Sequence, residues 1–202
     1  IHARVQAGEI GDLEQLTIIS RDPAPAPKDY LAVSGGIFRD QTIHDFDMAR
    51  FFIPNIVEVY ASGANVFSDD IKSLGDYDSA VVTLRGSKDE LVTIINSRHA
   101  SYGYDQRLEA FGSKGALLAT NVSPTTVKLY NDVTVEGRNP YMNFFLERYA
   151  FSYARELELF VEGIQTGKNN NPTFDDGRAA LILADAATES AKTGKAIKVN
   201  LK

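Results

Sequence analysis

Between residues 35 and 50 the sequence places an acid, a histidine and a second acid at helical spacing. Asp40, His44 and Asp47 follow an i, i+4, i+7 pattern, which stacks side chains on one helix face within roughly 60°. Most neighbouring residues are apolar, which is typical of a buried helix. Carboxylates and an imidazole are costly there unless they pair or face a polar site. The row therefore fits a catalytic site, or a structural Asp–His pair in the core or at a subunit contact.

The chemistry open to such a row is proton transfer to or from a hydroxyl group. Histidine suits this role near neutral pH, and a carboxylate on the preceding turn can orient the imidazole and favour its charged form. Tyr104, in the segment after the predicted strand that contains His99, is a further candidate for contact with a substrate. Its alternative role is to cap a sheet edge. The pair Arg21 and Asp22 either lines the same pocket or forms a solvated loop pair.

The row needs a helix to hold it, and the sequence predicts one over residues 36–52, ended by Pro54. Runs rich in Val, Ile, Thr, Tyr and Leu, separated by short turns, predict strands at 13–20, 57–66, 77–85, 91–100, 106–112, 116–121 and 125–130. Short turns imply hairpins, and hence a large, mostly antiparallel open β-sheet.

Two further helices are predicted over residues 141–166 and 175–192. The spacing of the aromatic residues in the first favours a place in the core over cofactor stacking. Helices packed on one face of such a sheet make an α+β fold, and we expect a single domain over residues 1–202. The other face carries aliphatic residues in places, since Ala80-Val81-Val82 and Ile94-Ile95 put them on both sides. An open, partly apolar face is a candidate partner surface, with a monomer as the alternative.

Composition narrows the classes of function. The 202 residues are 44% hydrophobic and 24% charged, as in ordinary globular proteins, and the net charge of −6 argues against nucleic acid or an anionic membrane as partner. The apolar runs are much shorter than the roughly 18–20 residues of a membrane span. No secretory signal opens the chain, so we expect a cytoplasmic protein. With no cysteine and three scattered histidines, no metal site is expected.

Several separate segments resemble the second domain of the Gfo/Idh/MocA oxidoreductases, in their inositol dehydrogenase branch. The most specific is the pattern GG-x-x-x-D-x-x-x-H-D-x-D over residues 35–47. The others are Gly-Glu-Ile-Gly at 8–11, Ser-Arg-Asp-Pro-Ala-Pro at 20–25, Tyr-Gly-Tyr-Asp-Gln-Arg-Leu-Glu at 102–109, Phe-Gly-Ser-Lys-Gly at 111–115 and Asp-Asp-Gly-Arg-Ala-Ala at 175–180. The resemblance covers nearly the whole chain and implies the same α+β fold.

The resemblance also implies a function. A nicotinamide-dependent dehydrogenase of this kind oxidises a secondary hydroxyl of myo-inositol or a related cyclic polyol or sugar, with His44 as general base. Asp40 would be the partner of His44 or a substrate contact, and Asp47 and Tyr104 would bind further hydroxyls. The family builds dimers and tetramers through the open sheet face, so the resemblance implies a homo-oligomer, such as a homotetramer.

One departure from the family limits what this chain does alone. No two of its 15 glycines are two residues apart, so no G-x-G-x-x-G dinucleotide fingerprint exists. The family's catalytic lysine, in a Glu-Lys-Pro element of the first domain, has no counterpart either. We expect a substrate and oligomerisation domain whose dinucleotide-binding domain is absent. NAD or NADP would then serve the full-length enzyme, none would bind this chain, and the isolated chain would be inactive.

A function of another class remains as the alternative. The chain would then be a non-catalytic ligand-binding or oligomerisation module derived from such a domain. The intact row of Asp40, His44 and Asp47 argues against this alternative, because a purely structural domain has no need of polar groups there.

Overall fold

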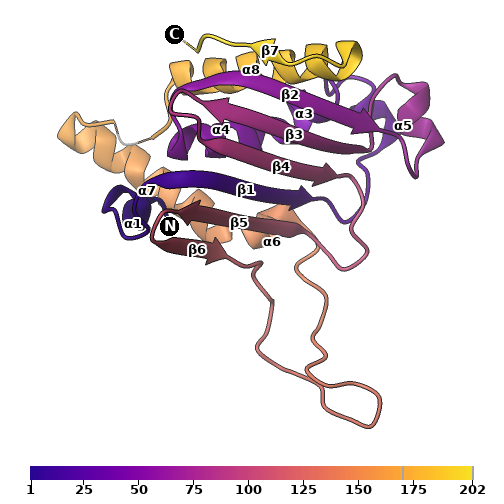
Figure 1. Cartoon of the computed structure of the whole chain (residues 1–202). Helices are drawn as coiled ribbons and strands as arrows, with labels where there is room; N and C mark the ends of the chain where they lie inside the picture. The colour runs from indigo at the N-terminus through magenta and orange to yellow at the C-terminus, as the bar shows by residue number, and fades with distance from the viewer. Residues whose placement is uncertain (170, 202) are drawn as a thin grey trace.

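A computed structural model describes residues 1–169 and 171–201 and is built around one sheet (Figure 1). In the described part the sheet has seven strands in the order β6-β5-β1-β4-β3-β2-β7. The strands are β1 (Leu13–Arg21), β2 (Ile56–Ala64), β3 (Ser79–Gly86), β4 (Leu91–Ser97), β5 (Asp105–Gly112), β6 (Gly115–Ala119) and β7 (Ile197–Lys198). The predicted mixed fold with a mostly antiparallel sheet is confirmed.

The hairpin prediction holds for two pairs of consecutive strands and fails at the centre of the sheet, where β1 lies between β4 and β5. β3–β4 and β5–β6 are antiparallel hairpins joined by short turns, and β2–β3 is antiparallel across a longer connection, residues 65–78. β1 pairs in parallel with β4, with Gln15 opposite Leu91 and Arg21 opposite Ser97. Parallel neighbours need a long crossover, and the helices and two strands between β1 and β4 provide it. Both central strands therefore end at the same edge of the sheet.

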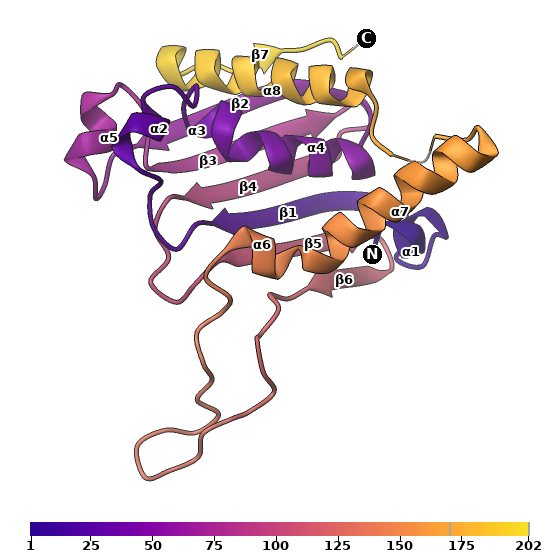
Figure 2. The same ribbon diagram turned by 180° about the vertical axis from the view of Figure 1, so that it is seen from behind.

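Helices cover one face of the sheet, as predicted (Figure 2). The chain runs through α1 (His2–Gln6), α2 (Lys28–Leu31), α3 (Ile37–Asp40), α4 (Thr42–Phe52), α5 (Asp69–Ser73), α6 (Phe145–Arg148), α7 (Ala150–Thr166) and α8 (Phe174–Thr193). α4 and α8 pack on each other and on the strands. Alternation in β3 turns Ala80, Val82 and Leu84 inward, where they join Phe46 and Leu183 in one core. No helix of the described residues is long and apolar enough to span a membrane.

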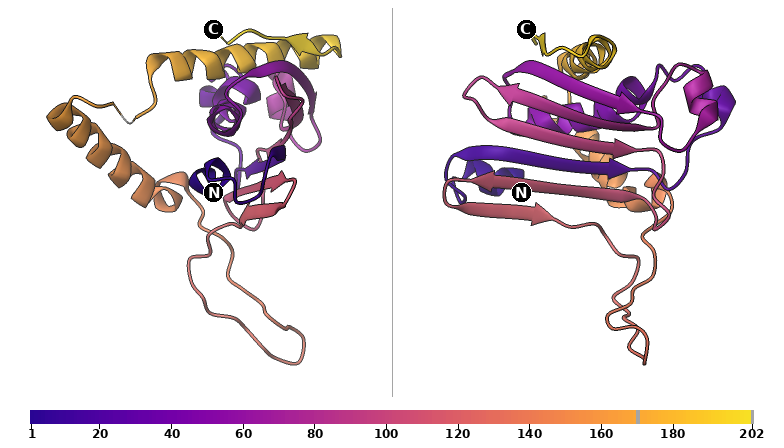
Figure 3. Two further views of the ribbon diagram at one scale, coloured as in Figure 1. Left: turned by 60° about the vertical axis from the view of Figure 1, so that its left-hand side comes forward. Right: turned by 45° about the vertical axis from the view of Figure 1, so that its right-hand side comes forward.

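No helix of the described residues covers the second face of the sheet (Figure 3, right). Val81 and Tyr60 point to this side and are 47% and 44% exposed. Ile19 on β1 and Ile95 on β4 lie opposite one another in neighbouring strands, and both are only part-buried. The predicted mixture of aliphatic and polar groups on the open face is confirmed.

The strand predicted at 125–130 is wrong. The chain leaves β6 as an extended arm that projects from the sheet and returns to it before α6 (Figures 1 and 2). One isolated antiparallel bridge, between Leu129 and Gly137, is the regular pairing in it. Its β-branched residues are exposed, with Val127 at 70% and Val133 at 84%. A run of strand-forming residues becomes a strand only where its side chains pack against a neighbouring strand or a core. The described residues provide neither for this run.

The helix predicted over 141–166 is corrected in extent and in burial. It consists of α6 and α7, and α7 buries none of its residues. Phe145 and Phe160, two aromatic residues expected in the core, are 41% and 58% exposed, and Ile164 is 69% exposed. An amphipathic pattern predicts that an apolar face exists, and the described residues supply no partner for this one.

Candidate active site

A glycine pair sets the entry into the segment that carries the predicted row. Gly35 and Gly36 both have φ of 88°, a conformation that side chains disfavour. A Cβ on Gly36 would also lie 2.9 Å from Oδ1 of Asp76. The same Oδ1 accepts a hydrogen bond of 2.8 Å from the backbone N–H of Ile37, the first residue of α3. The glycines therefore let the chain begin a helix directly against a carboxylate.

The helix predicted over 36–52 is two helices, α3 and α4, with a break at Gln41. The amide Nε2 of Gln41 donates to the carbonyls of Ser20 and Ser97, each at 3.2 Å. These carbonyls lie at the ends of β1 and β4. Tertiary bonds from Gln41 thus interrupt the helix and fix Asp40 and His44 above the shared edge of the two parallel strands.

Asp40 is engaged through both carboxylate oxygens. The Tyr30 hydroxyl donates to Oδ1 at 2.6 Å, and Nη1 of Arg98 lies 2.8 Å from Oδ2. Arg98 follows the end of β4, and its side chain is 2% exposed. Asp40 is therefore a carboxylate with fixed partners at the margin of the core.

His44 lies on the exposed side of α4. Its imidazole makes no hydrogen bond within the part of the chain that the structure describes, and none joins it to Asp40. Met48 and Phe51 share that side and are 43% and 55% exposed, so α4 buries one side only. The expectation of a helix packed in most directions is corrected, and the imidazole is open to a ligand or to another segment.

Asp47 stands one turn beyond His44 and is ion-paired. Nη1 of Arg50 lies 3.1 Å from its Oδ1, and Nη2 of Arg50 lies 3.2 Å from Oδ1 of Asp176 at the start of α8. The Asp47 side chain remains 45% exposed. Oδ2 of Asp47 can therefore accept from another donor, while Arg50 links the Asp47 carboxylate to the start of α8.

A buried carboxylate that the row did not include lies beneath these residues. Asp45 faces the sheet and accepts a 2.7 Å hydrogen bond from Nδ2 of Asn96. The Thr42 hydroxyl donates to Oδ1 of Asn96 at 2.8 Å and closes the network. Burial raises the pKa of Asp45 to about 7. The pattern in the sequence selected one helix face, and Asp45 lies on the other.

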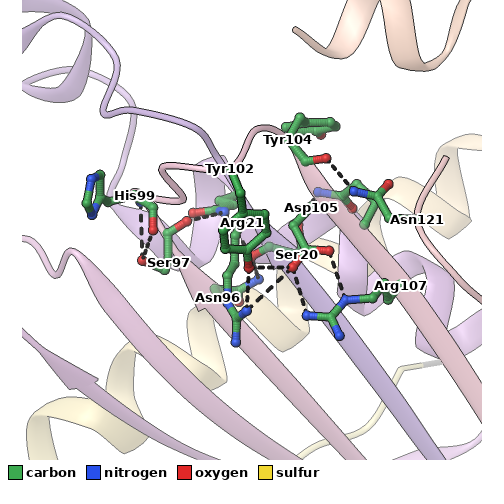
Figure 4. A network of polar contacts seen from close by, with 12 residues as sticks. Ser20, Arg21, Asn96, Ser97, His99, Tyr102, Tyr104, Asp105, Arg107 and Asn121 are labelled. Carbon is green, nitrogen blue, oxygen red and sulfur yellow. Dashed lines mark hydrogen bonds and ion pairs between the residues drawn. The ribbon is translucent and has the colours of Figure 1, made fainter. Parts of the chain in front are cut away.

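Tyr104 enters from the loop between β4 and β5 (Figure 4). Its backbone carbonyl accepts a hydrogen bond of 2.7 Å from Nδ2 of Asn121. Its ring contacts the Tyr149 ring edge-on, with 6.0 Å between the ring centroids. Burial raises the pKa of Tyr104, and the neighbouring Tyr149 and Asp22 add to this. Tyr104 thus remains a neutral hydrogen-bonding group throughout the pH range in which proteins are stable.

The next residue, Asp105, has a structural role. It is fully buried and accepts hydrogen bonds of 2.8 Å each from Nε and Nη2 of Arg107 (Figure 4). Tyr102 donates to it at 2.7 Å and Arg21 lies at 3.4 Å. Arg107 thus forms an ion pair with its neighbour Asp105, and Arg21 is paired with the same carboxylate.

Asp22 lies with the other acids. Its backbone N–H donates to the Ser97 carbonyl at 3.0 Å, which fixes the loop after β1 to the end of β4. Burial raises the pKa of its part-buried carboxyl to about 6, an effect opposed by Arg98 and reinforced by Asp40. The solvated loop pair considered for Arg21 and Asp22 is therefore wrong.

Taken together, acids and phenols converge on the edge where β1 and β4 end. Asp22 interacts electrostatically with Asp40, Asp45 and Tyr104. Carboxylates and phenols at fixed positions are suited to bind a molecule with several hydroxyl groups, since each buried hydroxyl needs a partner. Within the described residues no group of His, Asp and Glu is arranged to hold a metal ion. Asp45 and Tyr149 are the members that the sequence pattern missed, whereas Asp22 was considered as a pocket residue together with Arg21.

Known proteins resemble this chain over almost all of its length. The myo-inositol 2-dehydrogenase of Thermotoga maritima is 47% identical over 196 residues, which make up 96% of this chain and 58% of that protein. The crystal structure of a myo-inositol dehydrogenase from Corynebacterium glutamicum is 63% identical, with a TM-score of 0.97 over 98% of this chain and 60% of the other. The crystal structure of scyllo-inositol dehydrogenase from Lactobacillus casei, with bound NAD(H) and scyllo-inositol, is 26% identical with a TM-score of 0.87. The match covers 98% of this chain and 59% of the other.

The chain thus spans less than two thirds of the length of these relatives. The family model for the GFO/IDH/MocA C-terminal domain matches residues 1–118, more than half of the chain. By sequence and by fold, the chain belongs to the GFO/IDH/MocA family, as a C-terminal domain of it.

Proposed function

We propose that this chain is the substrate-side domain of an NAD(P)-dependent dehydrogenase that oxidises a secondary hydroxyl of myo-inositol or a related cyclic polyol or sugar. The observation that carries the proposal is the exposed imidazole of His44, which makes no hydrogen bond within the described residues and lies on the helix that follows Asp40 and its fixed partners. The inositol dehydrogenases among the relatives support the choice of substrate class.

In this proposal each residue has a separate task. A nicotinamide cofactor held outside this chain would supply the hydride acceptor for the carbon that is oxidised. His44 takes the proton of the hydroxyl on that carbon, and the carboxylate of Asp40 stabilises the imidazolium or binds the neighbouring hydroxyl. Asp47 and Tyr104 bind hydroxyls farther around the ring. Fixing the ring at several points holds the reacting hydroxyl against His44, which is the main advantage of a positioned base.

The rest of the enzyme is part of the same proposal. The residues of this chain provide no G-x-G-x-x-G turn, so they do not fit a dinucleotide, and the cofactor would be held by a separate N-terminal domain. Residues 1–202 would then act as a single substrate and oligomerisation domain, inactive by itself. The open sheet face, with Val81 and Tyr60 exposed, would form the contact between copies. A cytoplasmic location also stays a prediction.

The test is made on the complete parent protein. Its intact mass shows whether a further domain is present, and NAD(P)H formation is followed at 340 nm with a panel of inositols and sugars and with both cofactors. We expect turnover with at least one cyclic polyol and its loss in His44→Ala. A parent protein that ignores every polyol and sugar with both cofactors would contradict the proposal and favour a non-catalytic binding module.

A further inference from the structure

Arg98 is the most deeply buried cation of the described residues, at 1% exposure. It stands directly after β4, and its backbone N–H donates to the Asp78 carbonyl at 2.9 Å. A charge taken out of water at such a depth is costly unless it is fully paired. The identity of its partners therefore indicates what it is for.

Its partners are two carboxylates that lie far apart in the sequence. Nη1 lies 2.8 Å from Oδ2 of Asp40, and Nη2 lies 3.3 Å from Oδ2 of Asp76. The planar guanidinium can point two N–H groups in fixed directions, which a lysine ammonium does not reproduce. Arg98 thus fixes Asp40 relative to Asp76.

Asp76 is itself held in place. Its Oδ1 accepts the Ile37 N–H at 2.8 Å, and Gly36 leaves the space that this carboxylate occupies. The side chains of Arg98 and Asp76 are 2% and 8% exposed, against 13% for Asp40. The chain of contacts therefore runs from the core toward the surface and ends at Asp40.

We infer that Arg98 and Asp76 are positioning residues for Asp40 in the proposed dehydrogenase, a role that rests on the function proposed above. Nη1 of Arg98 donates to Oδ2 of Asp40 from within the core. Among the described residues Oδ1 is capped only by Tyr30, whose side chain is half exposed on the short helix α2. Oδ1 is therefore the oxygen that a substrate hydroxyl reaches by displacing the Tyr30 hydroxyl. A shift of Asp40 at this point misaligns the reacting hydroxyl and slows the chemical step.

The test uses the full-length dehydrogenase and the variants Arg98→Lys and Asp76→Asn. The control is Arg39→Lys, since Arg39 lies on the same helix as Asp40 but forms an exposed ion pair with Asp185. Active sites are counted by fluorescence titration with the reduced form of the nicotinamide cofactor that the parent uses. The kcat is then expressed per active site, which separates loss of folded protein from slower chemistry.

For Arg98→Lys we expect kcat per active site to fall at least tenfold, with KM for the polyol changed less than threefold. Asp76→Asn, which retains the acceptor for the Ile37 N–H, should lower kcat three- to tenfold, and Arg39→Lys should stay within twofold of the parent. Asp76→Asn decides the matter if Arg98→Lys does not fold.

A kcat per active site within twofold of the parent in the folded variants would overturn the inference. If His44→Ala then still abolishes turnover, the proposed function stands and the positioning role alone is wrong. A parent enzyme without any polyol-dependent turnover would overturn both.

Discussion

Replacing Asp45 by asparagine tests the electrostatics beneath the site. The folded chain raises the pKa of Asp45 to about 7, against about 3.9 for an unfolded aspartate. Between these values the folded state binds the extra proton, so the free energy of unfolding falls as pH rises from about 4 to about 7. At about 1.4 kcal/mol per pKa unit, the loss amounts to at most about 4 kcal/mol above pH 7.

Asp45→Asn keeps the shape and leaves an amide oxygen to accept the hydrogen bond from Asn96. It removes the ionisable group, so the variant should be more stable than the parent chain by about 2–4 kcal/mol at pH 8 and by only about 1.5 kcal/mol at pH 5, which is about one pH unit above the pKa of the unfolded aspartate. The free energy of unfolding in urea, followed by far-ultraviolet circular dichroism at both pH values, measures the difference. Asp47→Asn is the control, because that residue lies on the same helix and is 45% exposed. Equal pH dependence in the parent chain and in Asp45→Asn would refute the reasoning.

Two further predictions concern stability, and both come with a matched control. Gly36→Ala should strain the backbone of the folded state at positive φ and also displace the Asp76 carboxylate. It should therefore lower the free energy of unfolding by about 2–4 kcal/mol. Gly75→Ala, with positive φ but open space, should cost about 1–2 kcal/mol, and equal losses would contradict the Asp76 contact. Ser190→Ala should lower the free energy of unfolding by about 1–3 kcal/mol, because the buried hydroxyl forms hydrogen bonds with two backbone groups. Thr188→Ala on the same helix should stay within about 0.5 kcal/mol of the parent chain, and unfolding in denaturant compares the two variants.

The sequence was sufficient to predict those elements whose structure is determined by nearby residues. The helix predicted at 175–192 is observed as α8, whose N-terminus is closed by a capping box between Thr173 and Asp176. The alternation in β3 predicted both faces of the sheet correctly. These elements carry their own signals, namely caps and periodicity, within a few residues.

Where distant residues decide the structure, the sequence was not sufficient. The break at Gln41 depends on carbonyls of Ser20 and Ser97, and the partner of Asp40 proved to be Arg98, 58 positions away. No local pattern marks a buried arginine as the neighbour of a particular acid. Strand 125–130 and the burial of α7 were wrong for a related reason, since an apolar face predicts a contact without naming its partner.

The central claim is that His44 accepts the proton of the oxidised hydroxyl. Its most direct test is kcat of the full-length parent and of His44→Ala with the best cyclic polyol, with and without added imidazole. We predict a fall of about 10²–10⁴-fold in the variant, partly restored by imidazole in proportion to its neutral form. A variant that retains the parent kcat would contradict the assignment of His44 as the base.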